Sequence, residues 1–129
     1  MNCTVPISNS LLPPDKVRSL NRFVLRNVSL LQTHVVAQHL GKPREHALAI
    51  LQLIASSLGI EKVYLIYHDS CPVSSDAFVE ERPVRVGLPF FPYECPLCGQ
   101  IITNPDNISF DFAVRIPTGI QISVESLSA

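Results

Sequence analysis

An α+β fold is predicted for this chain of 129 residues, with three helices in its first half and short strands in its second. Apolar residues recur at helical spacing between residues 15 and 58, whereas β-branched and aromatic runs separated by prolines follow from residue 62 onward. A content of 47% apolar and 16% charged residues is typical of a globular protein of one domain. We therefore expect a flexible tail over residues 1–14 and a single compact domain over residues 15–129.

Three helices are expected before residue 60. The first starts at Asp15, after two prolines. The second has Ser29 as its N-cap and ends at Gly41, and its expected buried stripe is Leu31, Val35, Val36 and Leu40. The third has Pro43 in its first turn and continues to a stop at Gly59.

Strands are expected in the second half, where recurring prolines exclude long helices. Residues 62–68 are rich in β-branched and aromatic side chains and are too short for another helix. Residues 84–87 are expected to form a short strand. Residues 108–116 alternate apolar with polar or small side chains, so one face of that strand should be buried. A weaker strand is expected over residues 121–124, after a turn at residues 117–119.

The order of these elements resembles that of a winged helix-turn-helix protein. A first helix, two further helices joined by a tight turn, and a strand with a return strand follow one another over residues 15 to about 90. Residues 29–40 and 43–58 would be the helix-turn-helix pair. The resemblance implies a three-helix winged-helix core with a small β-sheet over residues 15–70, followed by a proline-rich β segment over residues 71–129 that carries a metal-binding knuckle.

Two cysteines separated by two residues mark a candidate metal site. In Cys95-Pro96-Leu97-Cys98-Gly99, one tight turn can present both sulfurs to a single ion, and the glycine relieves the backbone where the turn curls back. This motif looks like the knuckle of zinc ribbons and rubredoxin-like sites. In a reducing compartment, cysteines are more often metal ligands or free thiols than disulfides. We therefore expect a structural zinc ion bound by Cys95 and Cys98.

The best candidates for the other ligands lie at the end of the strand over residues 62–68. His68 and Cys71 are also separated by two residues, and with Cys95 and Cys98 they would complete a zinc site of three cysteines and one histidine. Residues 71–75 repeat the knuckle with its second cysteine and its glycine both replaced by serine. Two interpretations therefore stay open, in which either His68 supplies the fourth ligand or the site has lost its metal.

Other interpretations of the same residues also stay open. Cys71 is alternatively a small buried apolar residue, and His68 an ordinary strand histidine. Cys95 and Cys98 are alternatively a thiol–disulfide pair, but that chemistry favours a strand–helix context, whereas here a proline-rich segment precedes the pair and a predicted strand follows it. Cys3 lies in the predicted tail and is expected to be a free thiol.

The sequence lacks the usual signatures of catalysis, so we expect neither enzymatic activity nor a small-molecule substrate. It contains no glycine-flanked nucleophilic serine, no His-Glu-x-x-His motif, no phosphate-binding glycine loop and no dinucleotide fingerprint. Glu80 and Glu81 are adjacent and are expected in a solvated acidic loop rather than as a catalytic pair. Because no signal-peptide pattern or membrane-spanning run is found, we expect a cytoplasmic protein without membrane association.

Charge is unevenly distributed along a chain whose formal net charge is −1. Six basic and two acidic residues between positions 15 and 46 give +4, which leaves −5 for the remainder. The residues that would contact phosphates, if a winged helix bound DNA here, are Arg18, Arg22, Arg26, Lys42 and Arg44. The third helix, however, has few side chains able to read base edges, chiefly Gln52, Ser56 and Ser57.

We therefore predict a non-catalytic adaptor or regulatory subunit that binds a partner protein through a winged-helix scaffold stabilised by structural zinc. The alternative is a sequence-specific DNA-binding transcriptional regulator. The apolar residues just before the knuckle, Phe90, Phe91 and Tyr93, are the candidate docking residues for the partner protein. Their alternative role is to cover the core beside the metal.

Overall fold

The computed structural model describes residues 2–25, 28–74 and 77–127 and divides the chain into two compact units. Unit 1 comprises Met1–Glu61 and Ala113–Ala129, and unit 2 comprises Lys62–Phe112. Helices and strands are both present, which confirms the predicted α+β class. The division differs from the single compact domain expected over residues 15–129, because unit 2 is a continuous stretch of chain with a buried cluster of its own.

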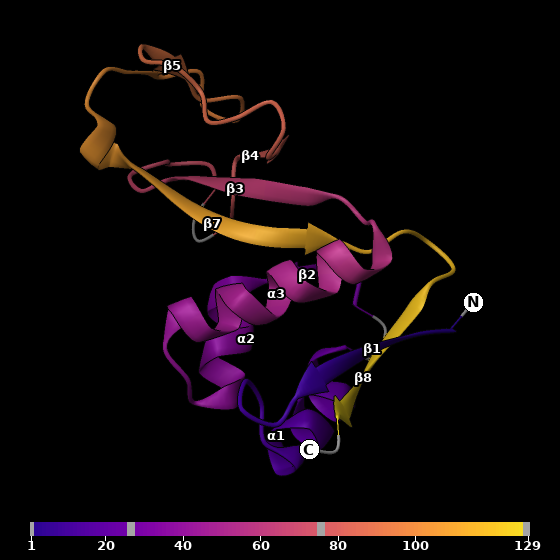
Figure 1. Cartoon of the computed structure of the whole chain (residues 1–129). Coiled ribbons are helices and arrows are strands. Elements are labelled where there is room, and N and C mark those ends of the chain that lie inside the picture. The colour runs from indigo at the N-terminus through magenta and orange to yellow at the C-terminus, as the bar shows by residue number, and fades with distance from the viewer. Residues whose placement is uncertain (1, 26–27, 75–76, 128–129) are drawn as a thin grey trace. The chain divides into compact units, whose positions relative to one another are not determined.

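Three α-helices of unit 1 follow one another in the order that the sequence predicts (Figure 1). The first, α1 (Pro14–Ser19), continues into a π-helical segment over Leu20–Val24. The next two are α2 (Thr33–Leu40) and α3 (Arg44–Leu58). Both end at glycines with left-handed backbone conformation, φ being +63° at Gly41 and +64° at Gly59. The predicted stops of these two helices are therefore confirmed, since glycine adopts this conformation without steric cost.

The second helix begins later than predicted. Leu30–Gln32 forms a strand, β2, that pairs antiparallel with residues 113–115 of β7 (Ile108–Arg115). Ser29 is therefore not the N-cap, because the backbone groups of the next three residues bond to a strand that sequence spacing alone does not reveal. Val35, which the predicted helical stripe placed in the core, is 44% exposed.

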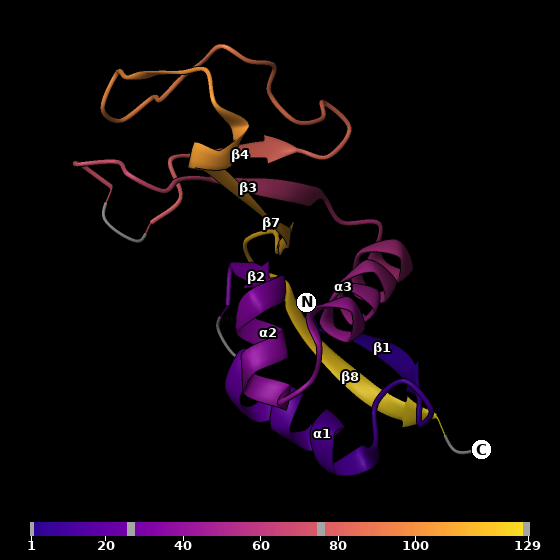
Figure 2. The same ribbon diagram turned by 90° about the vertical axis from the view of Figure 1, so that its left-hand side faces the viewer.

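The predicted flexible tail contains a strand. Asn2–Ser8 forms β1, which pairs in parallel with β8 (Gln121–Leu127), and the two lie side by side in Figures 1 and 2. Val5 and Ile7 of β1 are fully buried. Two buried residues at alternate positions give too weak a local signal to predict a strand, and the partner strand is at the other end of the sequence.

Asn21 acts as a side-chain partner for the backbone of β8. Its Nδ2 donates to the Val124 carbonyl at 2.8 Å, and its Oδ1 accepts from the Val124 amide at 2.8 Å. Replacing Asn21 by alanine is expected to lower the free energy of unfolding by roughly 2 kcal/mol, because two backbone groups of a buried residue lose their partner. Urea unfolding measures the change, and Asn21→Asp, which places a second acceptor oxygen against the Val124 carbonyl, should also lose stability. An unchanged stability in Asn21→Ala would contradict this role.

Unit 2 contains short strands joined by turns. They are β3 (Lys62–His68), which lies where the sequence predicts it, β4 (Glu80–Pro83), β5 (Tyr93–Glu94) and β6 (Ile101–Ile102). A single 3₁₀ turn at Pro105–Asn107 leads into β7. β4 pairs antiparallel with β3, β7 lies on the other side of β3, and β5 and β6 form a separate hairpin.

Two strand predictions in the second half need correction. Residues 84–87 form a turn, closed by a hydrogen bond from the Gly87 amide to the Val84 carbonyl, and the strand lies earlier, at Glu80–Pro83. Pro83 and the positive φ of Gly87 favour a turn over a continued strand. In β7 the buried face is not purely apolar, because Asp111 is buried while Phe110 is only half-buried.

Helix α3 supplies much of the core of unit 1. Its inward face is apolar at helical spacing and consists of Ala47, Ile50, Leu51, Ile54 and Ala55. Within the ranges that the structure describes, no helix combines the length and the hydrophobicity needed to cross a bilayer.

Candidate metal centre

The four predicted ligands come together in unit 2. One ligand atom from each of His68, Cys71, Cys95 and Cys98 lies within 4.8 Å of the other three. The Cys71 and Cys95 sulfurs are 3.9 Å apart, and the Cys98 sulfur is 3.5 Å from His68 Nδ1. Around a tetrahedral ion, with bonds of about 2.3 Å to sulfur and 2.0 Å to nitrogen, such pairs are separated by about 3.8 and 3.5 Å respectively. The spacing of these side chains therefore fits one tetrahedral metal ion.

The end of β3 positions His68 and Cys71. Just beyond the strand, the Asp69 amide donates to the Asn107 carbonyl at 3.0 Å, and the Asp69 carboxylate accepts from the Ser109 hydroxyl at 2.7 Å. The Cys71 amide then donates back to the His68 carbonyl at 3.1 Å, which closes the turn between the two ligands. The His68 and Cys71 side chains are thus directed to one point because β3 is tied to the start of β7.

The hairpin of β5 and β6 positions the other two ligands. The Cys95 amide donates to the Gln100 carbonyl, and the Gly99 amide donates to the Cys95 carbonyl, both at 2.9 Å. Gly99 has φ +75°, the left-handed conformation that lets the chain turn back directly after Cys98. The local geometry of the predicted knuckle is therefore present.

The site is largely removed from solvent. His68, Cys71 and Cys95 are buried, and Cys98 is half-buried. Around the ligands pack the other members of a small apolar cluster, namely Ile66, Val79, Tyr93, Ile102 and Ile108, with Phe91 and Phe110 at its edge. Burial of this kind strengthens metal–thiolate interactions and slows exchange with water.

The thiols have opposing ionisation preferences. The Ser74 side chain, the amides of Val73 and Ser74 and the His68 ring together lower the pKa of Cys71 to about 6, against the effect of burial. At Cys98 the Gln100 amide also favours the thiolate, but desolvation and the Cys95 and Cys71 sulfurs outweigh it and raise the pKa. The Cys71 and Cys98 thiols therefore do not both ionise easily, and a divalent cation beside them would remove this conflict.

Ser74 is a contact to the site that the sequence did not predict as functional. It occupies the place in residues 71–75 that Cys98 has in the knuckle, and its amide lies 3.4 Å from the Cys71 sulfur. The buried Ser74 hydroxyl makes no hydrogen bond of regular geometry within the described chain. We therefore attribute the contact between Ser74 and Cys71 chiefly to the Ser74 amide. Ser74 thus contacts a candidate ligand, and the fourth side chain whose ligand atom lies with those of the three cysteines is His68. The repeat of the knuckle was the signal that could have revealed this role.

The predicted docking residues separate into two groups. Phe90 is 92% exposed, whereas Tyr93 is only 8% exposed and Phe91 packs against the buried cluster. Tyr93 donates a hydrogen bond of 2.6 Å from its hydroxyl to Glu80 Oε1, and Glu80 lies in β4 and not in the solvated loop expected for it. Tyr93 and Phe91 therefore cover the core beside the candidate ligands, which is the alternative role for these residues, and of the three only Phe90 is available to a partner.

Replacing Tyr93 by phenylalanine is expected to lower the stability of unit 2 by about 1 kcal/mol, because it removes a hydrogen bond to a carboxylate that is itself partly solvated. Burial and the Glu80 carboxylate raise the pKa of the Tyr93 phenol well above its usual range. Spectrophotometric titration of the tyrosines should therefore lose its highest transition in the variant. A titration identical to that of the wild type would contradict the hydrogen bond.

The basic residues predicted to contact DNA lie in unit 1. Arg18 and Arg22 are exposed in and directly after α1, Arg44 is exposed at the start of α3, and Lys42 is half-buried between α2 and α3. Arg26 lies outside the described residues. On α3 the exposed side chains include Gln52, Ser56 and Ser57, the same few base-reading candidates that the sequence offers.

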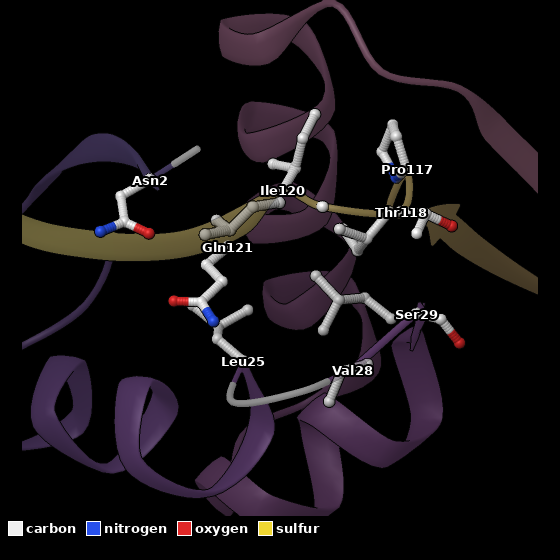
Figure 3. Close-up of a pocket in the computed structure, with 12 residues that line it drawn as sticks. Asn2, Leu25, Val28, Ser29, Pro117, Thr118, Ile120 and Gln121 are labelled. Carbon is white, nitrogen blue, oxygen red and sulfur yellow. The ribbon is translucent and has the colours of Figure 1, made fainter.

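Unit 1 also contains a pocket of about 490 Å³ (Figure 3). Its walls come from β2, the residues before it, and the segment from Ile116 to Ile122. No acidic, basic or cysteine side chain is among the lining residues, which are Asn2, Leu25, Val28, Ser29, Leu31 and residues 116–122. The pocket therefore offers apolar walls with a few neutral polar groups and no acid–base or metal chemistry.

The chain matches no protein-family model, no curated protein and no solved structure. Its class is therefore defined by its own features, which are a mixed α/β fold and a cluster of one histidine and three cysteines spaced to hold a metal ion.

Proposed function

We propose that this chain is a non-catalytic adaptor or regulatory subunit that binds a partner protein and whose unit 2 is held together by a structural zinc ion. The location of the exposed apolar side chains carries the proposal. Of eight large apolar side chains exposed among the described residues, six belong to unit 2: Val73, Val86, Leu88, Phe90, Leu97 and Ile101. Unit 2 thus carries most of the exposed apolar side chains, and this enrichment supports a protein-binding surface on it.

The chemistry of the ligands supports zinc in a structural role. Three thiolates and one imidazole in a tetrahedral arrangement favour zinc over oxygen-preferring ions such as magnesium or calcium. Four protein ligands leave no open position for a catalytic water, so the ion would hold the turn of β3 against the β5–β6 hairpin. All four cysteines of the chain are unpaired, and a reducing cytoplasm, which we include in the proposal, would keep them so.

The proposed scaffold is the winged helix that the element order resembles. The order of α1, α2, α3 and β3 with β4 as an antiparallel return strand supports it, as does the tight turn between Gly41 and Pro43. In the position of a recognition helix, α3 buries five residues and exposes few base-reading side chains. This distribution favours use of the scaffold for protein binding.

Purification of the tagged chain from the cells that encode it, at near-physiological salt, tests the proposal. We expect a stoichiometric complex with another protein that survives gel filtration, together with one zinc ion per chain. The complex should be lost in Cys98→Ser, which removes a ligand, and kept in Cys3→Ser, which removes a thiol of β1 in unit 1. Recovery of the wild-type chain alone would refute the adaptor role.

DNA binding is the second candidate function, and the charge of unit 1 favours it. Seven basic and four acidic residues give this unit a formal charge of +3, and Arg18, Arg22 and Arg44 are exposed. A salt titration of binding to mixed-sequence duplex DNA separates the two functions. The adaptor proposal expects weak binding even at low salt, whereas submicromolar affinity that falls steeply with salt would support a DNA-binding regulator.

A further inference from the structure

Three apolar side chains project outward at alternate positions just before the metal knuckle. Val86, Leu88 and Phe90 are all exposed, whereas the intervening Gly87 and Pro89 are half-buried. Val86 lies in the turn at residues 84–87, and Leu88 and Phe90 follow it directly, so the three side chains share one short exposed segment. We call Val86, Leu88 and Phe90 the apolar row.

Both ends of the apolar row are fastened to β4. On one side, Arg82 Nε donates to the Gly87 carbonyl at 3.1 Å. On the other, Tyr93 donates to Glu80 at 2.6 Å, and a salt bridge of 3.3 Å joins Arg82 to Glu80. A continuous polar chain from Gly87 through Arg82 and Glu80 to Tyr93 therefore fixes the segment that carries the row.

The covalent structure of the segment restricts it further. Pro89 and Pro92 have fixed φ angles, and Phe91 between them packs against the buried cluster. An exposed apolar segment held in this way loses little conformational entropy when a partner covers it, so more of the interaction energy appears as affinity. Phe90, as the most exposed and the only aromatic member of the row, has the properties of an anchor residue.

The charge of unit 2 limits the class of partner. Three basic and seven acidic residues between positions 62 and 112 give a formal charge of −4. A zinc ion bound by three thiolates would contribute a further −1. Nucleic acids and the anionic lipids of a cytoplasmic membrane surface would be repelled, whereas a protein surface with basic residues around an apolar cleft would be attracted.

We propose that the apolar row is the docking element of this protein and that Phe90 inserts into an apolar cleft of a partner protein whose rim is basic. This inference rests on the proposed adaptor function and specifies its binding surface. The polar chain between Gly87 and Tyr93 keeps the row in its binding conformation, and the acidic surface of unit 2 steers it to the basic rim.

Photo-crosslinking in the cells that encode the protein tests this placement. A benzophenone amino acid replaces Phe90 in one variant and Val35, which is exposed in unit 1, in a matched control. The protein crosslinked from position 90 is identified and purified, and its affinity for the wild-type chain, Phe90→Ser and Val35→Ser is measured over a range of salt concentrations. We expect Phe90→Ser to weaken binding at least tenfold, Val35→Ser less than twofold, and added salt to weaken the wild-type complex.

A variant that removes one of the hydrogen bonds between β4 and the segment of the apolar row provides a second measurement. Tyr93→Phe leaves the apolar row unchanged but loosens one of its ends, so we expect it to weaken the complex severalfold. Because Phe90 is 92% exposed, its serine variant should keep its metal and its fold, which zinc content and amide spectra verify.

Four results would overturn the docking role of the row. They are a crosslink from position 90 to a second copy of this chain, a partner whose cleft is acidic, binding to phosphatidylserine vesicles that Phe90→Ser abolishes, and a complex with undiminished affinity in Phe90→Ser. The last result would leave the adaptor function standing and remove only this surface. Absence of any protein complex with the wild-type chain would refute both.

Discussion

Replacing Cys95 by serine is expected to release the bound metal and unfold unit 2 while unit 1 keeps its structure. Apart from the ligands, the buried cluster around the site comprises, among the residues that the structure describes, Ile66, Val79, Tyr93, Ile102 and Ile108. A unit of this size with so small a cluster needs a further source of stability. A structural zinc site contributes about 10–16 kcal/mol of apparent binding energy in zinc-finger peptides, which exceeds what this cluster can supply.

Elemental analysis and amide hydrogen exchange measure this effect. The wild-type chain should carry one zinc ion, and chelation or Cys95→Ser should remove protection from residues 62–112 and leave it over α2 and α3. Cys3→Ser is the matched control, since Cys3 is a free thiol in β1 and should leave both metal and protection unchanged.

His68→Ala tests the fourth ligand separately. Its Nδ1 lies 3.5 Å from the Cys98 sulfur, so the variant should lose most of its metal affinity. Full zinc content in this variant, together with its loss in Cys95→Ser, would remove His68 from the site and keep the cysteines. A wild-type chain purified without zinc under reducing conditions would refute the metal centre as a whole.

Replacing Ile54 by alanine is expected to lower the free energy of unfolding of unit 1 by about 2–5 kcal/mol. Ile54 is fully buried on the inward face of α3, and its truncation leaves a cavity that the surrounding helices and strands can fill only in part.

Urea unfolding in the presence of zinc, followed by the signals of unit 1, measures the loss. Gln52→Ala lies on the exposed face of the same helix and should change stability by less than about 0.5 kcal/mol. Equal effects of the two substitutions would mean that α3 does not bury the face that carries Ile54.

Local features of the sequence determined several elements of this protein. Gly41 and Gly59 end α2 and α3 because a left-handed residue closes a helix, and β3 lies over residues 62–68 because its β-branched and aromatic side chains suit a strand. The pairs His68/Cys71 and Cys95/Cys98 were recognisable because a spacing of two residues lets one turn present both ligands. Each of these signals acts over a few residues, so no knowledge of the rest of the chain was needed.

Only the tertiary structure decided the features that depend on distant partners. Leu30–Gln32 is a strand because it pairs with β7, and residues 2–8 are ordered because β8 lies beside them, with Thr4 and Ser123 in contact across 119 positions of sequence. Tyr93 is buried with its hydroxyl donating a hydrogen bond to the Glu80 carboxylate, which leaves Phe90 as the exposed aromatic of its segment. Hydrogen bonds and burial supplied from far along the chain outweigh local preference at these positions, so the sequence around each of them could not predict its structure.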